Sequence, residues 1–202
     1  MIINPNFYYS TTHPFIALSN VFTDNECDLI SEIGSNLPMM DSVTGGEQSV
    51  YSIHRQSKNS FLEPNSETEW IFNRIIEAST FVNEKYFQYE LYGFSFIQYA
   101  EYSGDLDHYN WHMDLDPIKD VQVGYVASTR KLSASVILSD PSDYEGGVFE
   151  MYLNPDTTAE HTITQEKGGV IFFPSYAMHR VTPVSDGLRK SLVVWIEGPK
   201  FK

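Results

Sequence analysis

The pattern of apolar and polar residues changes near residue 90, and beyond it the chain reads as strands. Short apolar or alternating runs follow one another there without a helical period, which is typical of β-structure. Turn signals such as Gly146-Gly147 and Asn154-Pro155 separate them. The runs cover residues 91–102, 132–138, 148–153, 161–165, 170–173 and 191–196. Short, regularly spaced strands predict an antiparallel β-sandwich or barrel.

The first 90 residues carry two helical patterns. Thr23 and Glu26 form a capping-box pattern before an apolar helical face, with Gly34 as the expected end. Ser66 and Glu69 form a second such pattern, before a face that runs to residue 82. The polar stretch 40–59 between them predicts a long loop with a strand near residues 50–53. The expected fold class is therefore α+β and mainly β, with N-terminal helices packed on one sheet.

One domain over residues 1–202 is expected, because no repeat or linker divides the chain. Residues 1–90 form its helix-bearing part and residues 91–200 its β-sandwich core.

Composition and charge restrict the partners of this domain. The chain has 202 residues, with 27 acidic and 13 basic side chains, and its formal net charge is -14. Such a balance argues against nucleic acid and against anionic lipid as partners. The single cysteine, Cys27, excludes an intramolecular disulfide and a cysteine-built metal site. No apolar stretch is long enough to span a bilayer, and residues 1–10 lack a signal-peptide pattern, so we expect a cytoplasmic protein.

A candidate metal site lies in the segment Tyr109-Asn110-Trp111-His112-Met113-Asp114. On a strand, His112 and Asp114 would point to one face, separated by roughly 7 Å of rise. His179, which follows the run 170–173 and a turn, is the candidate third ligand. Two histidines and one carboxylate form the facial triad of non-heme Fe(II) oxygenases, which leaves coordination positions open for a cosubstrate and dioxygen.

Arg189 opens the last predicted strand, ten residues after His179. A buried strand rarely carries an inward arginine unless an anion pairs with it. The guanidinium matches a carboxylate in a bidentate way, so a dicarboxylate that chelates the metal at one end could bind here with its other end.

With these residues in place, the sequence resembles the Fe(II)- and 2-oxoglutarate-dependent dioxygenases, in particular their prolyl-4-hydroxylase-like branch. The resemblance extends over residues 21–195. Besides the triad and Arg189, it includes Tyr102 ten residues before His112, an acidic turn that ends in Gly146-Gly147, and Trp195 six residues after Arg189. It implies a double-stranded β-helix, or jelly-roll, fold.

The resemblance also implies a role for each of these residues. His112, Asp114 and His179 would bind Fe(II), and Arg189 would bind the distal carboxylate of 2-oxoglutarate. Tyr102, Ser191 and Trp195 would assist in holding this cosubstrate. The reaction would use O2, with ascorbate as a candidate accessory, and would couple decarboxylation of 2-oxoglutarate to succinate with hydroxylation of a prolyl residue in a peptide or protein.

Arg55, Arg130 and Tyr109 are candidate substrate contacts, the two arginines because they match arginines that touch the peptide in oxygen-sensing relatives. The chain also departs from those relatives: they have a second tyrosine for the cosubstrate where this chain has Ile137. The group that assists Arg189 at the distal carboxylate is therefore left open.

Other functions compete with this hypothesis. The substrate could instead be a free amino acid or small metabolite, and a cupin-like metal enzyme without 2-oxoglutarate or a non-catalytic binding module would use a similar sandwich. A nucleic-acid demethylase is disfavoured because such relatives carry a second arginine where this chain has Trp195. Six acidic residues and one lysine within residues 101–120 surround the metal motif, so we expect a neutral or basic substrate.

Overall fold

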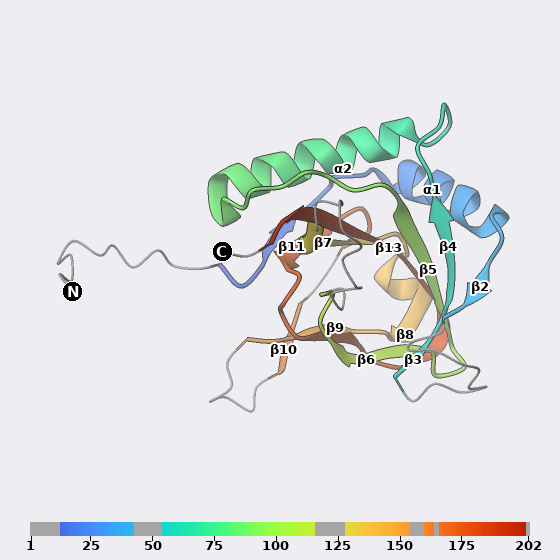
Figure 1. Ribbon diagram of the computed structural model, residues 1–202. Helices are drawn as coiled ribbons and strands as arrows, with labels where there is room; N and C mark the ends of the chain where they lie inside the picture. The colour runs from blue at the N-terminus through green and yellow to red at the C-terminus, as the bar shows by residue number, and fades with distance from the viewer. Residues whose placement is uncertain (1–12, 43–53, 116–127, 154–159, 164–165, 201–202) are drawn as a thin grey trace, which may run out of the picture.

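The computed structural model describes residues 13–42, 54–115, 128–153, 160–163 and 166–200. The predicted strand near residues 50–53 lies outside these residues. Two helices and two antiparallel sheets make up the described part, with the helices on one side of the larger sheet (Figure 1). Within it, neither helix is both long and apolar enough to cross a membrane.

Helix α1 (Asp24–Asn36) begins as its sequence predicts. The Thr23 hydroxyl accepts a hydrogen bond from the Glu26 N–H, while the Glu26 carboxylate accepts one from the Thr23 N–H, so the capping box is confirmed. The expected end at Gly34 is wrong, because the helix continues to Asn36. Gly34 instead lies so close to the Tyr99 ring that a Cβ atom there would overlap it.

Helix α2 (Glu69–Val82) begins differently from its prediction. The capping residue is Thr68 and its side chain does not cap the helix, so the predicted capping box of Ser66 and Glu69 is wrong. Asn65 takes over instead, because its side-chain oxygen accepts hydrogen bonds from the N–H groups of Glu67 and Thr68. A π-helical turn, η1 (Asn83–Phe87), follows α2.

The larger sheet has the strand order β1-β11-β7-β13-β5-β4-β2, with β8 paired to β13 outside this path. Its strands are β1 (Ile16–Leu18), β2 (Met40–Asp41), β4 (Lys58–Leu62), β5 (Ile97–Ser103), β7 (Ser128–Ile137), β11 (Val170–Pro174) and β13 (Val184–Pro199), and β8 spans Tyr144–Gly146. Two predicted boundaries need correction. The first strand run is extended only from Ile97, and the last strand begins at Val184, so Arg189 lies inside β13 and does not open it.

The smaller sheet has the order β10-β9-β12-β6-β3 and lies opposite the larger one (Figure 1). Its strands are β3 (Arg55–Gln56), β6 (His108–His112), β9 (Phe149–Tyr152), β10 (Glu160–Thr162) and β12 (His179–Val181). Strands β3, β6 and β12 were not expected as strands, because they are short and rich in His, Asn and Arg and carry no apolar alternation.

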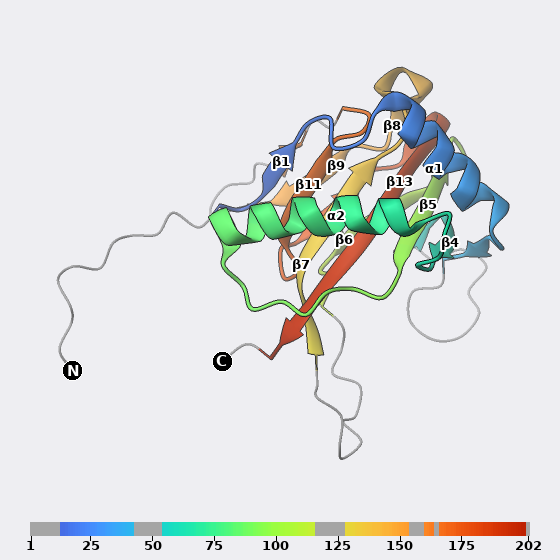
Figure 2. The same cartoon turned by 90° about the horizontal axis from the view of Figure 1, so that it is seen from above.

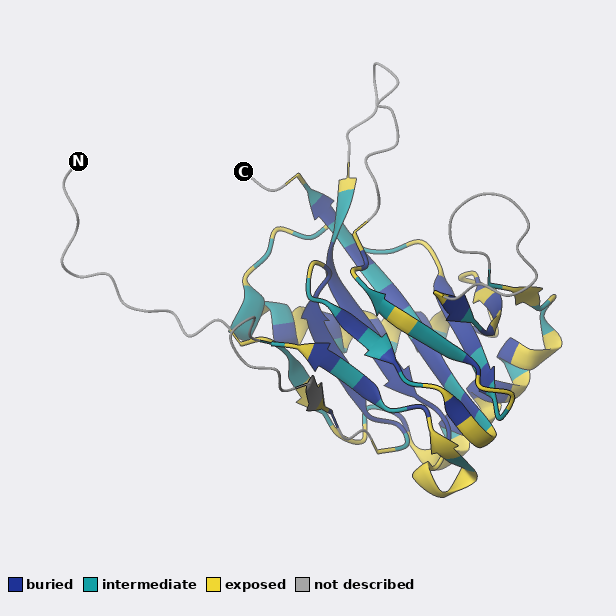
Figure 3. Cartoon of the chain, turned by 90° about the horizontal axis from the view of Figure 1, so that it is seen from below, coloured by how far each residue is buried: buried dark blue, intermediate teal, exposed yellow. Residues whose placement is uncertain are grey.

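The two faces of the larger sheet bury different clusters. Its outer face, which includes Tyr99, Leu192 and Val194, packs under the helices, and α2 crosses the strands there (Figure 2). Its inner face meets the smaller sheet through a second cluster that includes Tyr102, Phe149 and Phe173. Seen from the smaller sheet, buried positions run along the strands and exposed ones gather on loops and helices (Figure 3). The predicted packing of N-terminal helices on one sheet is confirmed.

Candidate active site

The structure brings His112, Asp114 and His179 together at the inner face of the smaller sheet. His112 is the last residue of β6 and lies directly opposite His179, the first residue of β12. Asp114 lies two residues beyond the end of β6, and its N–H donates to the Ser175 carbonyl at 2.8 Å. His112 and Asp114 therefore do not share one strand, the arrangement that the sequence left open, although their side chains do converge. The ligating atoms of all three residues lie within 4.8 Å of one another.

The three side chains present the atoms that a divalent cation requires. Asp114 Oδ1 lies 3.6 Å from His112 Nε2, and Asp114 Oδ2 lies 3.6 Å from His179 Nε2. Both distances are too long for good hydrogen bonds, and within the described residues Asp114 Oδ2 is buried with no hydrogen-bond partner. A buried carboxylate oxygen without a partner, facing two imidazole nitrogens, is a donor set that fits Fe(II).

The electrostatics of this cluster favour an ionised Asp114 carboxylate and a neutral His179 imidazole. Burial raises the pKa of Asp114, but His179 and His112 outweigh it and hold that pKa below its ordinary value. Burial lowers the pKa of His179, and Asp114 opposes this effect only in part. Metal ligands must be deprotonated to bind, so these directions suit metal binding.

Carbonyl groups orient both imidazoles. His112 Nδ1 lies 2.7 Å from the Asn110 carbonyl, and His179 Nδ1 lies 2.9 Å from the Ala177 carbonyl. Because an N–H at Nδ1 would donate to these oxygens, Nε2 of each ring is left to face Asp114. The Tyr109 ring stacks on His112, with centroids 3.4 Å apart and planes 11° apart, and so restricts that ring further.

Arg189 lies on the inner face of the larger sheet, across the cavity from the histidines. It is 1% exposed, its Nη1 donates to Ser191 Oγ at 3.2 Å, and its guanidinium carbon lies 5.6 Å from the centre of the Tyr102 ring. Gly147, at φ +58, leaves room for its stem, since a Cβ there would come within 2.8 Å of Arg189 Cδ. No carboxylate of the described chain forms an ion pair with Arg189, and its Nε has no hydrogen-bond partner. A buried cation in this state is a site for an anion.

A narrow cavity joins the histidine cluster to Arg189. Its walls come from both sheets and combine polar groups with apolar side chains. The lining residues are Arg55, Gln98, Tyr102, Tyr109, His112, Asp114, Ser135, Phe149, Phe173, His179, Val181, Arg189, Ser191, Val193 and Trp195.

The predicted cosubstrate residues Tyr102, Ser191 and Trp195 all line this cavity, Tyr102 and Ser191 beside Arg189 and Trp195 farther along β13. Ile137, the apolar departure from the family pattern, lies opposite Ser191 in the register of β7 and β13 and is fully buried. Because Ile137 offers no polar group, Ser191, whose Oγ already contacts Arg189, is the hydroxyl that we expect to help Arg189 bind the distal carboxylate.

Of the three predicted substrate contacts, Arg55 and Tyr109 lie inside the cavity and Arg130 lies nearby. The guanidinium carbon of Arg55 lies 4.5 Å from the centre of the Tyr109 ring, and that of Arg130 lies 4.1 Å from the Trp195 ring. Arg55 is buried and donates to Ser57 Oγ and Asn59 Oδ1 at 3.1 and 2.9 Å. These contacts indicate that Arg55 helps to support Tyr109, whereas a role in substrate binding stays a prediction.

Sequence reasoning missed two polar residues of the cavity, Gln98 and Ser135. Both line it and both are buried, at 3% and 5% exposure. A signal was present: Gln98 and Tyr102 are four apart on one strand, so the alternation that points Tyr102 inward also points Gln98 inward.

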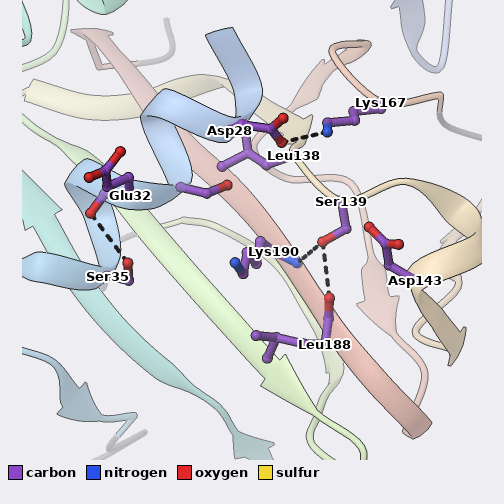
Figure 4. Close-up of a pocket in the computed structure, with 10 residues that line it drawn as sticks. Asp28, Glu32, Ser35, Leu138, Ser139, Asp143, Lys167, Leu188 and Lys190 are labelled. Atoms are coloured by element: carbon purple, nitrogen blue, oxygen red, sulfur yellow. Dashed lines mark hydrogen bonds and ion pairs between the residues drawn. The ribbon is translucent and has the colours of Figure 1, made fainter. Parts of the chain in front are cut away.

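A second pocket lies on the opposite side of the larger sheet, between α1 and the loops beside β13 (Figure 4). It is lined by side chains of both charges and holds an ion pair between Asp28 and Lys167. Its lining shares no residue with the lining of the cavity at the metal-ligating cluster, so this pocket is separate from the candidate active site.

The comparison with protein families matches residues 97–197 to the 2OG-Fe(II) oxygenase superfamily. A PKHD-type hydroxylase of Azoarcus sp. (strain BH72) is 35% identical over 99 residues, which are 49% of this chain and 41% of that relative. The chain thus spans about two fifths of the length of the curated relatives that it matches.

Solved structures show the same fold. The viral collagen prolyl hydroxylase of Paramecium Bursaria Chlorella virus-1, in its 2OG complex, has a TM-score of 0.67 at 22% identity, with 95% of this chain and 99% of that chain covered. A Trichoplax adhaerens prolyl hydroxylase, in complex with a hypoxia inducible factor oxygen degradation domain peptide fragment, has a TM-score of 0.70 at 18% identity, with 92% and 84% covered. The predicted jelly-roll fold is confirmed. The family match covers the segments that hold His112, Asp114, His179 and Arg189, and the chain belongs to the 2OG-Fe(II) oxygenase superfamily.

Proposed function

We propose that this chain is an Fe(II)- and 2-oxoglutarate-dependent dioxygenase that hydroxylates prolyl residues of a peptide or protein. One observation carries the proposal: a His112–Asp114–His179 cluster and a buried arginine without an ion-pair partner among the described residues share one cavity. The superfamily membership, the PKHD-type relative and the prolyl hydroxylase structures support it.

In this proposal His112, Asp114 and His179 hold the metal, and Arg189 with Ser191 binds the distal carboxylate of 2-oxoglutarate. The bound metal would supply the oxidative chemistry that turns 2-oxoglutarate, O2 and the prolyl substrate into succinate, carbon dioxide and the hydroxylated prolyl product. The chain itself orients the two imidazoles through the Asn110 and Ala177 carbonyls. Apolar side chains of the lining exclude water from the reacting atoms; these are Phe149, Phe173 and Val181.

The proposed substrate is a prolyl-containing segment that is neutral or basic. Asp105 lines a surface depression that adjoins β5 and would favour a basic partner, whereas Glu101 lies on the outer face of β5 and accepts a hydrogen bond from the Tyr99 hydroxyl. Asp107 contributes less to this field, because its carboxylate turns inward and accepts hydrogen bonds from Ser103 at 2.9 and 3.0 Å. We further propose that the chain acts as one domain, because both buried clusters share the larger sheet. A cytoplasmic location stays a prediction.

The test is succinate formation by purified protein with Fe(II), 2-oxoglutarate and a library of proline-containing peptides of varied charge. We expect succinate in the presence of both cofactors, and a peptide product heavier by one oxygen atom on proline. His179→Ala should abolish both signals, whereas His108→Ala, which changes a histidine of β6 outside the cluster, should keep them. Succinate formation without a peptide product would exclude prolyl peptides as the substrate, and the absence of both 2-oxoglutarate binding and turnover would refute the proposal.

A further inference from the structure

Gln98 is a buried polar residue that lines the candidate active site. It lies on β5 directly opposite Val193 of β13, and it lines the cavity that joins the metal-ligating cluster to Arg189. Its exposure is 3%. An amide so placed is shielded from solvent and must find its hydrogen bonds inside the cavity.

The side-chain amide of Gln98 has no hydrogen-bond partner among the residues that the structure describes. An amide offers two N–H donors and one carbonyl acceptor, and leaving such groups unpaired in the interior costs about 1–3 kcal/mol. Asn59, a buried amide on the neighbouring strand β4, shows the contrast: its oxygen accepts from Arg55 at 2.9 Å and its nitrogen donates to Ser42 at 2.5 Å. The empty hydrogen-bonding positions of Gln98 therefore indicate that a bound molecule supplies the partner.

The register of the strands indicates which part of the cavity Gln98 serves. Along β13, Arg189, Ser191, Val193 and Trp195 face the cavity in turn, and Ser191 accepts a hydrogen bond from the Arg189 guanidinium. Gln98 is level with Val193, one step of two residues beyond Ser191, which is roughly 7 Å along the strand. A five-carbon dicarboxylate has about this length, so a molecule whose distal carboxylate lies on Arg189 has its other end beside Gln98.

The next residue along the same face supports this placement. Trp195 lies one further step along β13, and Arg130 connects it to the metal-ligating cluster, because its guanidinium covers the Trp195 ring and donates to the Asp114 carbonyl. The indole Nε1 of Trp195 is buried with no hydrogen-bond partner in the described chain. Two unpartnered donors therefore lie together at one end of the cavity, at the opposite end from Arg189.

We propose that the Gln98 amide hydrogen-bonds the keto-acid end of 2-oxoglutarate and so makes the site selective for a 2-keto dicarboxylate over a simple dicarboxylate. An amide N–H donates to the oxygen atoms of the C1 carboxylate and the neighbouring keto group, which succinate lacks at that position. The inference rests on the proposed function, since it assigns a residue to the cosubstrate named there.

The test compares the binding of 2-oxoglutarate and succinate to the Mn(II)-loaded protein by calorimetry. Gln98→Met keeps the length of the side chain and removes its polar atoms. We expect a roughly five- to hundredfold loss of affinity for 2-oxoglutarate, with less than a threefold change for succinate. The metal-free variant should unfold at the same or a higher temperature than the wild type, because an unpaired buried amide has been removed; a purely structural glutamine would instead lower that temperature.

Two further variants keep the test decisive. Gln98→Glu, which keeps the shape but places a carboxylate beside the ligand, should also weaken 2-oxoglutarate more than succinate, and it serves if the methionine variant does not fold. Gln56→Met on β3, outside the cavity lining, is the matched control and should change neither affinity. An unchanged 2-oxoglutarate affinity in both Gln98 variants, or an equal loss for both ligands, would overturn the inference. If the wild-type protein binds no 2-oxoglutarate, the proposed function is refuted, and the inference about Gln98 is refuted as well because it rests on that function.

Discussion

Arg189 gives the most specific prediction, because burial of its charged guanidinium destabilises the folded protein as long as no ligand is bound. The guanidinium is 1% exposed and keeps one hydrogen bond, to Ser191, and one ring contact, to Tyr102. Burying an ion costs several kcal/mol even after relaxation, and these two contacts return about 1–2 kcal/mol. Arg189→Met, which fills much of the same volume, should therefore leave the free protein as stable or more stable by about 1–3 kcal/mol.

The same substitution should remove the site for 2-oxoglutarate. A charge-assisted hydrogen bond is worth about 1.5–3 kcal/mol, so loss of a bidentate pair should weaken binding by roughly a hundredfold or more. Wild-type protein at a ligand concentration of 100 times Kd gains about 2.7 kcal/mol of stability. At about 2–4 °C per kcal/mol for a domain of this size, its Tm should rise by roughly 5–11 °C, whereas the Tm of the Arg189→Met variant should rise by less than about 2 °C at that concentration.

The assay is thermal unfolding with and without 2-oxoglutarate, in the presence of Mn(II). Arg74→Met is the matched control: Arg74 pairs with Glu26 on the helical side, so its loss should leave the ligand-induced rise intact. The reasoning would be refuted by an Arg189→Met protein that is less stable without ligand and yet keeps the full rise with ligand. Arg189 would then be a structural cation with a partner that compensates its burial.

Three further predictions concern the helical layer. Gly34→Ala should destabilise the protein by about 1–3 kcal/mol through overlap with the Tyr99 ring, although alanine normally favours a helix, and urea unfolding measures this. Thr23→Ala should cost about 0.5–2 kcal/mol in the same assay because it removes a formed cap, while Ser66→Ala should cost close to nothing; an equal loss in both would contradict the observed helix start. Burial raises the pKa of the Cys27 thiol to about 11, so at pH 8 the neutral thiol predominates and a disulfide reagent should label it only after unfolding; rapid labelling of the folded protein would show that Cys27 is accessible.

The sequence predicted the parts of the fold that local patterns control. The cap at Thr23 depends on residues three apart, and the buried strand at residues 170–173 depends on an unbroken apolar run, so neither needs a distant partner. The start of α2 was misassigned because Asn65 competes for the same backbone N–H groups as Ser66, and side chains of both types cap helices.

The candidate site was predictable in its chemistry and less so in its environment. His112, Asp114, His179 and Arg189 were found from residue types and spacing, and the structure places all four around one cavity. The burial of Arg55 could not be predicted, because it depends on Tyr109 and Asn59, which only the paired strands bring to it.

Strand β13 shows how one segment can serve both binding and stability. Arg189, Ser191, Val193 and Trp195 face the cavity, while Leu192, Val194 and Ile196 lie in the cluster under the helices. Because side chains alternate along a strand, a one-residue slip would move the buried arginine under the helices and the apolar residues into the cavity, so the large apolar cluster also fixes the register of the site. Substitutions in the first set should therefore change ligand binding with little loss of stability, and those in the second set should do the reverse. The predictions for Arg189→Met and Gly34→Ala test this division. The first changes a residue of the cavity face, and the second crowds Tyr99 on the helical face of the same sheet.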